Sequence, residues 1–194
     1  MKKQDNYQRI LEVAEHYTQT VGYNAFSYHD IAEKVGIKTS SIHYHFPTKA
    51  DLGKAVVKKH IDGLCDELEQ LMANKKLSCR KKLELFIDGI VAKTYFAERK
   101  MCLGGMLASD ILTLPDTIQH EVRIFFNRLH HWLKRLLTEA IEKKEFYIER
   151  KHIKNEVMLI LSILEGALLL ARLFQDEEYL TAARKHLIAR LMKD

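Results

Sequence analysis

Turn-forming residues are rare in this sequence, and this scarcity limits the possible folds more than any other feature. The 194 residues include only two prolines and eight glycines. Between them, apolar residues recur at helical spacing, as at Ile10, Val13, Tyr17 and Val21, and no segment alternates as a half-buried strand would. We therefore expect an all-α protein.

The few breaks divide the chain into helices. Gly22 ends the first apolar stripe, and Gly36 and Pro47 interrupt the chain twice more. Pro115 suits the first turn of a long helix. Beyond the first stripe, the predicted helices span residues 28–35, 39–45, 49–73, 78–97, 101–112, 116–144, 153–175 and 178–192.

A helix-turn-helix motif fits the segment between two predicted capping boxes. Ser27-x-x-Asp30 opens a short helix, and Thr48-x-x-Asp51 opens a long one. Gly36 lies between them, in a turn that joins the first short helix to a second. Five apolar residues could pack the two short helices together: Ile31, Ala32, Val35, Ile37 and Ile42.

The second short helix, "TSSIHYH", carries polar side chains that would face outward. Small hydroxyls suit close approach to a phosphate, and Tyr and His can bond to phosphates or base edges. The first 60 residues hold nine Lys and Arg against six Asp and Glu, a weak bias toward a polyanionic partner. A metal site at His43 and His45 is disfavoured, because residues two apart on a helix point about 200° apart. We expect no metal site.

The stretch "DIAEKVGIKTSSIHYHFPTKADL", residues 30–52, resembles the TetR family of bacterial transcriptional repressors. The similarity lies in Ile-Ala followed by Gly-Ile, a short recognition helix, an aromatic pair, Phe-Pro and Lys-x-x-Leu. The segments "HYHFPTKADLG" and "CLGGMLASDILTLP" are similar to a subgroup related to electrophile-responsive repressors. The resemblance implies a helix-turn-helix DNA-binding domain at 1–52 and a helical ligand-binding and dimerisation domain at 53–194.

The resemblance also implies which residues contact double-stranded DNA. His43 departs from the tyrosine usual at its position, and Ser40 replaces a smaller residue or glycine. Lys49 matches the lysine that touches phosphate at the start of the linking helix. The implied DNA-contacting residues are Ser27, Lys38, Thr39, Ser40, Ser41, His43, Tyr44, His45 and Lys49.

The last two helices are implied to pair with their copies in a homodimer. "LILSILEGALLLARLF" is apolar around more of its circumference than a monomer of this size would readily cover. The two recognition helices would then enter major grooves about 34–36 Å apart on a palindromic operator. The expected interface residues are Leu161, Leu164, Gly166, Leu168, Leu187 and Leu191.

An unknown small-molecule effector would bind the second domain and weaken DNA binding by displacing the helix that starts near Lys49. Core packing is the alternative role for each candidate pocket residue. The candidates are Phe86, Tyr95, Met101, Cys102, Met106, Phe125, Phe126 and Trp132.

The three cysteines, Cys65, Cys79 and Cys102, form no CxxC motif and indicate reduced thiols in a cytosolic protein. Cys102 matches the position of a sensing thiol in the electrophile-responsive relatives. Cys79 follows Ser78 at a predicted helix start beside basic residues, which should favour its thiolate. A thiol-based sensor of electrophiles or oxidants is therefore one alternative function.

The remaining function classes are less well supported. No nucleotide-binding or hydrolase motif is present, so we expect neither an enzyme nor a cofactor. The apolar run 157–174 contains Glu165 and Arg172, which disfavour a membrane span, and the N-terminus lacks the apolar region of a signal peptide. We expect a cytoplasmic protein that associates with the nucleoid through DNA binding. A helical adaptor that binds proteins and not DNA is the second alternative function.

Overall fold

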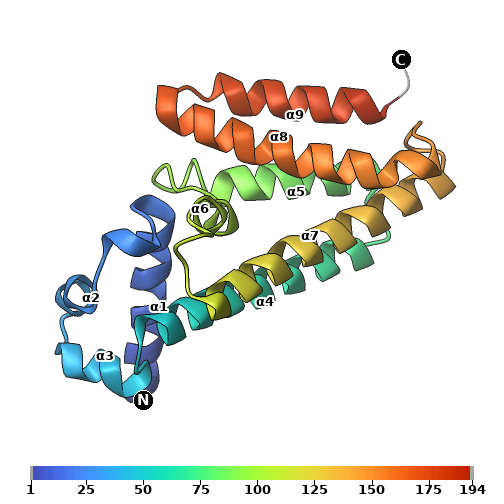
Figure 1. Ribbon diagram of the computed structural model, residues 1–194. Coiled ribbons are helices and arrows are strands. Elements are labelled where there is room, and N and C mark those ends of the chain that lie inside the picture. The colour runs from blue at the N-terminus through green and yellow to red at the C-terminus, as the bar shows by residue number, and fades with distance from the viewer. Residues whose placement is uncertain (1, 193–194) are drawn as a thin grey trace. The chain divides into compact units, whose positions relative to one another are not determined.

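The computed structural model describes residues 2–192, with side chains from residue 5 onward, and contains no strand within that range. This arrangement confirms the all-α prediction. Figure 1 shows the order of the helices along the chain. They are α1 Lys2–Thr20, η1 Tyr23–Ala25, α2 Tyr28–Val35, α3 Thr39–His45, α4 Lys49–Ala73, α5 Cys79–Lys93, α6 Leu103–Ser109, α7 Asp116–Glu142, η2 Arg150–His152, α8 Ile153–Phe174 and α9 Glu178–Leu191.

The chain packs as two compact units. Unit 1 comprises residues 1–63 and 103–126, and unit 2 comprises residues 64–102 and 127–194. The helices α4 and α7 each contribute residues to both units. Unit 1 thus combines the helix-turn-helix segment with α6 and the first part of α7.

In unit 1, α1 packs against both α2 and α6. Ile10 and Ile31 are fully buried at the centre of this packing, since neither exposes any surface. The guanidinium of Arg9 donates a 2.8 Å hydrogen bond to the carbonyl of Val35 at the end of α2. This bond satisfies one of the carbonyls that a helix leaves without a partner at its last turn.

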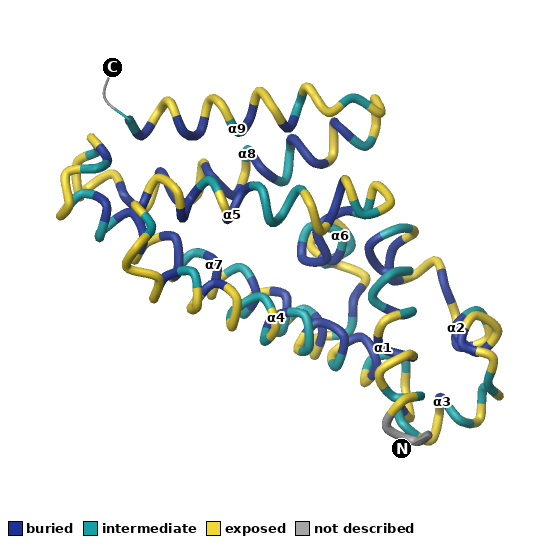
Figure 2. The backbone as a smooth tube through the Cα atoms, turned by 180° about the vertical axis from the view of Figure 1, so that it is seen from behind, coloured by how far each residue is buried: buried dark blue, intermediate teal, exposed yellow. Residues whose placement is uncertain are grey.

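In unit 2, α9 packs against α8 and α5. Figure 2 shows α9 with buried residues on the side that faces α8 and exposed residues on the other. Two bidentate ion pairs hold α9: Arg184 binds Asp88 of α5 at 2.6 and 3.1 Å, and Arg190 binds Glu156 of α8 at 2.8 and 2.9 Å. Each fork-shaped guanidinium matches both carboxylate oxygens and so fixes the register of α9.

Two helices are each five residues shorter than predicted. The helix expected at 78–97 ends at Lys93, because Thr94, with φ −112° and ψ −88°, leaves helical geometry. The helix expected at 101–112 is confined to Leu103–Ser109, and Glu98 and Arg99, which precede it, have positive φ.

Candidate nucleic-acid interface

The first helix of the motif, α2, begins and ends as its sequence predicts. The backbone N–H of Ser27 donates to Asp30 at 2.7 Å, and the Ser27 hydroxyl accepts from the N–H of His29 at 3.2 Å. The Ser27 hydroxyl also donates to Asp30 at 2.7 Å, and this bond, followed by the bond from the Ser27 N–H, lowers the pKa of the Asp30 carboxyl. At the other end Gly36 adopts φ 76°, and its N–H bonds to the last turn of α2. The first capping box and the glycine turn are confirmed.

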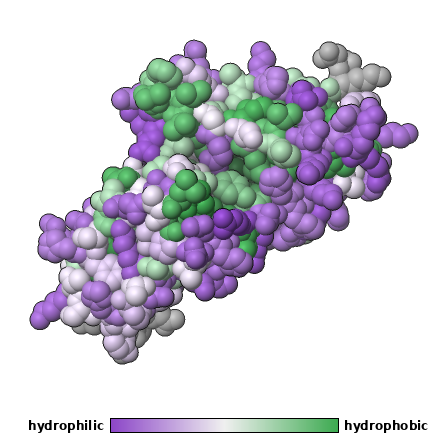
Figure 3. Space-filling model, viewed as in Figure 1, coloured by the Kyte–Doolittle hydropathy of each residue, from purple (hydrophilic) through white to green (hydrophobic). Residues whose placement is uncertain are grey.

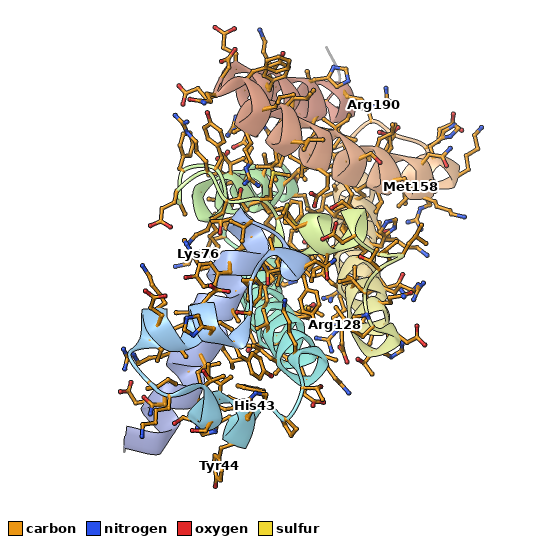
Figure 4. The ribbon with its side chains drawn as sticks, turned by 60° about the vertical axis from the view of Figure 1, so that its left-hand side comes forward. His43, Tyr44, Lys76, Arg128, Met158 and Arg190 are labelled. Atoms are coloured by element: carbon orange, nitrogen blue, oxygen red, sulfur yellow. The ribbon has the colours of Figure 1, made fainter. Side chains whose placement is uncertain are left out.

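The second helix, α3, is anchored through a single buried residue. Ile42 exposes none of its surface, whereas Tyr44 exposes 67%. Figure 4 shows the Tyr44 side chain extending away from α3. Among the residues implied to contact DNA, those with exposed side chains are Ser27, Lys38, Ser40, His43 and Tyr44, and those half-buried are Thr39, Ser41, His45 and Lys49.

The two histidines of α3 contact different neighbours. The ring of His43 lies edge-on to Tyr28, with 4.7 Å between ring centroids, and its Nδ1 is 3.3 Å from the carbonyl of Pro47. The ring of His45 instead lies 5.8 Å from Tyr7. No group of three or more His, Cys, Asp and Glu residues suited to a metal occurs within the described part of the chain.

Tyr28 is a site residue that the sequence analysis did not single out. Its buried hydroxyl donates a 2.9 Å hydrogen bond to the carbonyl of Phe46, the residue that ends α3. Burial, followed by the negative charge of Asp51, raises the pKa of Tyr28 to about 12, so the hydroxyl keeps its proton. The sequence shows only that Tyr28 is an aromatic residue at the first position of a capped helix. This does not reveal which group its hydroxyl bonds to.

Lys49, which the resemblance places at a phosphate, bonds within the protein. Its ammonium donates a 2.6 Å hydrogen bond to the carbonyl of Tyr23 and a second bond to the carbonyl of Phe26. It also lies over both aromatic rings, 4.7 Å and 4.3 Å from their centroids. Burial lowers the pKa of the Lys49 ammonium, and the charge of Asp30 partly offsets this effect.

The second capping box, at the start of α4, is confirmed. The N–H of Thr48 donates to the Asp51 carboxylate at 3.0 Å, and the N–H of Asp51 donates to the Thr48 hydroxyl at 3.1 Å.

Five of the six residues expected at a dimer interface lie in the core of unit 2. Leu161, Leu164, Leu168, Leu187 and Leu191 expose at most 7% of their surface, and Gly166 is half-buried. The five leucines pack within unit 2, and the assignment of all six residues to a dimer interface stays a prediction. The apolar side chains of α8 that do reach the surface are Met158, Leu159, Leu169, Leu170, Leu173 and Phe174. We call this set the apolar face of α8, and Figure 3 shows hydrophobic surface gathered where α8 lies.

The candidate pocket residues divide between the two units. Met106, Phe125 and Phe126 belong to unit 1, and Phe86, Tyr95, Met101, Cys102 and Trp132 belong to unit 2. The ring of Phe86 stacks on Trp132, and the Trp132 indole donates a 2.8 Å bond to the carbonyl of Leu68. These contacts give both rings a structural role. The pocket itself stays a prediction.

Unit 2 also contains an open groove of about 600 Å³. Tyr95 is the one pocket candidate among its lining residues. The groove is lined by Tyr95, Phe96, Glu98, Arg99, Gln175, Asp176 and Glu177.

The cysteines differ from the sequence expectation at one position. Cys79 exposes none of its surface, and burial, followed by the charges of Glu145 and Glu139, raises its pKa to about 11. The predicted preference for the thiolate is therefore wrong, because it considered only the basic residues next to Cys79 in the sequence. Cys102 is also buried, and it hydrogen-bonds to the side chain of Glu165.

Glu165 is a half-buried residue in the middle of α8 whose carboxyl group is largely shielded from solvent. Its Oε2 atom is inaccessible and has no hydrogen-bond partner among the described residues. Burial raises the pKa of Glu165, and the bond to Cys102 opposes that rise. Buried polar atoms are nearly always paired, so an orphaned carboxyl oxygen needs an explanation.

Within residues 2–192, one helical segment is long and apolar enough to be considered as a membrane span. Residues Arg150–Phe174 pass that test on length and composition alone, with 39% of the most apolar window buried inside the chain. Core helices of soluble proteins pass the same test.

Comparison with known proteins agrees with this architecture. A family model described as "Bacterial regulatory proteins, tetR family" matches residues 10–56, the segment that contains the helix-turn-helix motif. A TetR transcriptional regulator from Legionella pneumophila is 44% identical, covers 96% of this chain and 97% of its own, and superposes with a TM-score of 0.90. A TetR-family regulator from Agrobacterium tumefaciens is 29% identical over 98% of this chain and all of its own, also with a TM-score of 0.90.

A more distant relative carries a different name. The nucleoid occlusion factor SlmA of Vibrio vulnificus is 22% identical over 171 residues, or 86% of this chain and 84% of that protein. The match to the Legionella regulator spans nearly the full length of both chains at an identity that specifies the family. This chain therefore belongs to the TetR family of bacterial transcriptional regulators.

Proposed function

We propose that this protein is a ligand-responsive transcriptional regulator, acting as a repressor, that binds a two-fold symmetric DNA operator as a homodimer. The observation that carries the proposal is the division of α3 into two sides. Ile42 secures the helix to the core, while Ser40, His43 and Tyr44 expose hydrogen-bonding groups to solvent. A short helix with an apolar anchor and a polar outer side suits insertion into a major groove.

The second copy of the chain is proposed to bind the apolar face of α8. Leu169, Leu173 and Phe174 expose 57%, 67% and 59% of their surfaces, and they lie close together in sequence on one helix. A cluster of this kind is typical of a surface that is covered in the assembled protein. On α9 the small residues Ala182 and Ala189 are also exposed and permit close approach.

The effector is proposed to bind in unit 2. The orphaned Oε2 of Glu165 supports this placement, because a hydrogen-bond donor on a ligand would satisfy it. Since α4 contributes residues to both units, a ligand that shifts α4 would alter the helix-turn-helix segment and weaken DNA binding. Such a protein would act in the cytoplasm, at the nucleoid.

Selection of bound fragments from a genomic library, followed by a salt titration of affinity, tests the proposal. A repressor of this type should enrich an inverted-repeat sequence and bind it with a steep negative slope of log affinity against log salt. Absence of any DNA binding at low salt would instead support a protein-binding adaptor. Gel shifts repeated with candidate effectors then identify the class that releases the DNA.

A further inference from the structure

The contacts of Lys49 form a closed structural site rather than a free surface charge. Two of its three N–H donors bond to the carbonyls of Tyr23 and Phe26, and its charge lies over both rings. A cation within about 6 Å of an aromatic ring centroid gains further electrostatic attraction from the ring. While these contacts persist, only the third N–H donor is left for a phosphate.

The segment that Lys49 binds is the turn between α1 and α2, residues 22–26, which we call the α1–α2 turn. It includes η1 and Gly22, whose φ of 96° favours glycine. Phe26 directly precedes Ser27, the N-cap of α2. Lys49 therefore ties the first residue of α4 to the start of the helix-turn-helix motif.

Other contacts in unit 1 reinforce this attachment. Gly53 lies one turn beyond Lys49 on the same side of α4, and a Cβ atom there would come within 2.8 Å of the Tyr23 ring. The glycine thus lets α4 press against the ring whose carbonyl Lys49 holds. The side-chain amide of Asn24 in the same turn donates a 3.0 Å hydrogen bond to the hydroxyl of Thr113, so a second segment of the chain also binds the turn.

The position of α3 depends on this attachment. The chain from the end of α3 to the start of α4 is only Phe46, Pro47 and Thr48. Before Pro47 in the sequence, Phe46 is bonded through its carbonyl to Tyr28. After Pro47, Lys49 is bonded to the α1–α2 turn. With both ends of the connection secured, α3 is presented to DNA in one orientation.

Resting on the proposed DNA-binding function, we infer that Lys49 is a positioning residue that clamps α4 to the α1–α2 turn and thereby orients α3. It contributes to DNA specificity through the placement of Ser40, His43 and Tyr44, not through a phosphate contact. Operator binding then depends in part on the position of α4, because Lys49 links α4 to the α1–α2 turn.

Hydrogen exchange tests the clamp without DNA. In the full-length protein, Lys49→Ala should speed amide exchange in residues 22–28, and the neutral donor variant Lys49→Gln should do so less. Lys54→Ala, which removes an exposed lysine from the same helix, should leave that segment unchanged. Unchanged exchange in Lys49→Ala would overturn the clamp.

Salt-dependent DNA binding separates a clamp from a phosphate contact. Lys49→Ala should lower operator affinity at least about tenfold and leave the affinity for unrelated DNA unchanged. The slope of log affinity against log salt should also stay the same. Loss of a phosphate contact would instead reduce the magnitude of that slope by about 1. Lys38→Ala, which removes an exposed lysine beside α3, provides the reference for that loss of slope. A salt slope reduced by about 1 in Lys49→Ala would contradict the positioning role of Lys49.

A double variant adds a second check. Phe26→Leu removes one of the two aromatic rings under the Lys49 ammonium but keeps the Phe26 carbonyl. If the ring acts through Lys49, the double variant Phe26→Leu with Lys49→Ala should bind operator about as weakly as Lys49→Ala alone. Fully additive losses would contradict a shared role. If the wild-type protein bound no DNA, the proposed function would fail, and the exchange experiment would still decide whether the clamp exists.

Discussion

The hydroxyl of Tyr28 donates a 2.9 Å hydrogen bond to the main-chain carbonyl of Phe46, so the first residue of α2 holds the residue that ends α3. This bond crosses 18 positions of sequence and is buried. It joins the two helices of the motif at the end opposite to Gly36. The orientation of α3 thus depends on a buried residue of α2.

Replacement of Tyr28 by Phe should destabilise unit 1. The substitution leaves the buried Phe46 carbonyl without its donor, which costs about 1–2 kcal/mol of unfolding free energy. Urea unfolding measures the loss, and gel shifts should show weaker operator binding. Tyr44→Phe, which removes an exposed hydroxyl, should leave the unfolding free energy unchanged; equal losses in the two variants would contradict the role of the buried bond.

Replacement of Tyr44 by Ala should affect DNA binding alone. Its ring is 67% exposed, so the free energy of unfolding should hardly change. Operator affinity should fall at least about fivefold, corresponding to about 1 kcal/mol, because a groove contact is lost. Tyr147→Ala, at a tyrosine of unit 2 that is 59% exposed, is the matched control and should bind DNA normally.

Charges placed on the apolar face of α8 should dissociate the homodimer. Leu169→Glu or Leu173→Glu would bury an unpaired carboxylate against the second copy, and the dimer dissociation constant should rise at least about tenfold. Sedimentation velocity over a concentration series measures the change. Leu112→Glu introduces the same charge at a leucine of unit 1 that is 95% exposed, and it should remain dimeric. Dimers that persist in both α8 variants would place the interface elsewhere.

Replacement of Glu165 by Gln should stabilise the protein at neutral pH. Burial raises the pKa of this carboxyl above its ordinary value of 4.5, so the unfolded state releases the proton more easily than the folded state. The folded state is not penalised below pH 4.5, and it loses stability as the pH rises toward the raised pKa. The melting temperature gained by Glu165→Gln should therefore grow as the pH rises above 4.5 and level off above the raised pKa. A gain that is constant over this range would show that ionisation of Glu165 is not the cause.

Cys79 should be the least reactive of the three thiols. Its pKa is raised to about 11 and none of its surface is exposed, whereas Cys65 is half-buried. Brief treatment with N-ethylmaleimide followed by mass mapping should find Cys65 modified and Cys79 intact, because only a thiolate reacts. DNA binding followed in parallel tests sensing at Cys102: full modification of Cys102 with no change in affinity would remove the thiol-sensor alternative.

Local sequence signals predicted the helices and their boundaries well where a cap is built from neighbouring residues. Ser27 with Asp30, Thr48 with Asp51, and Gly36 act over three or four positions, so residue type and spacing are sufficient to recognise them. The same spacing correctly separated His43 from His45. The helix expected at 78–97 extends past the true end at Lys93, because no glycine or proline follows that residue to mark it.

The sequence by itself determined the all-helical class, the helix-turn-helix motif and the residues of α3 that carry polar groups, because each of these follows from local periodicity and capping. Only the tertiary structure decided where Lys49 places its charge, which side of α8 is exposed, and whether Cys79 is a thiolate. Each of these depends on partners far away in the chain: carbonyls 23 and 26 positions before Lys49, the packing of α9 on α8, and Glu139 and Glu145 near Cys79. Burial and long-range pairing set the charge and accessibility of a side chain, and neither can be read from its sequence neighbours.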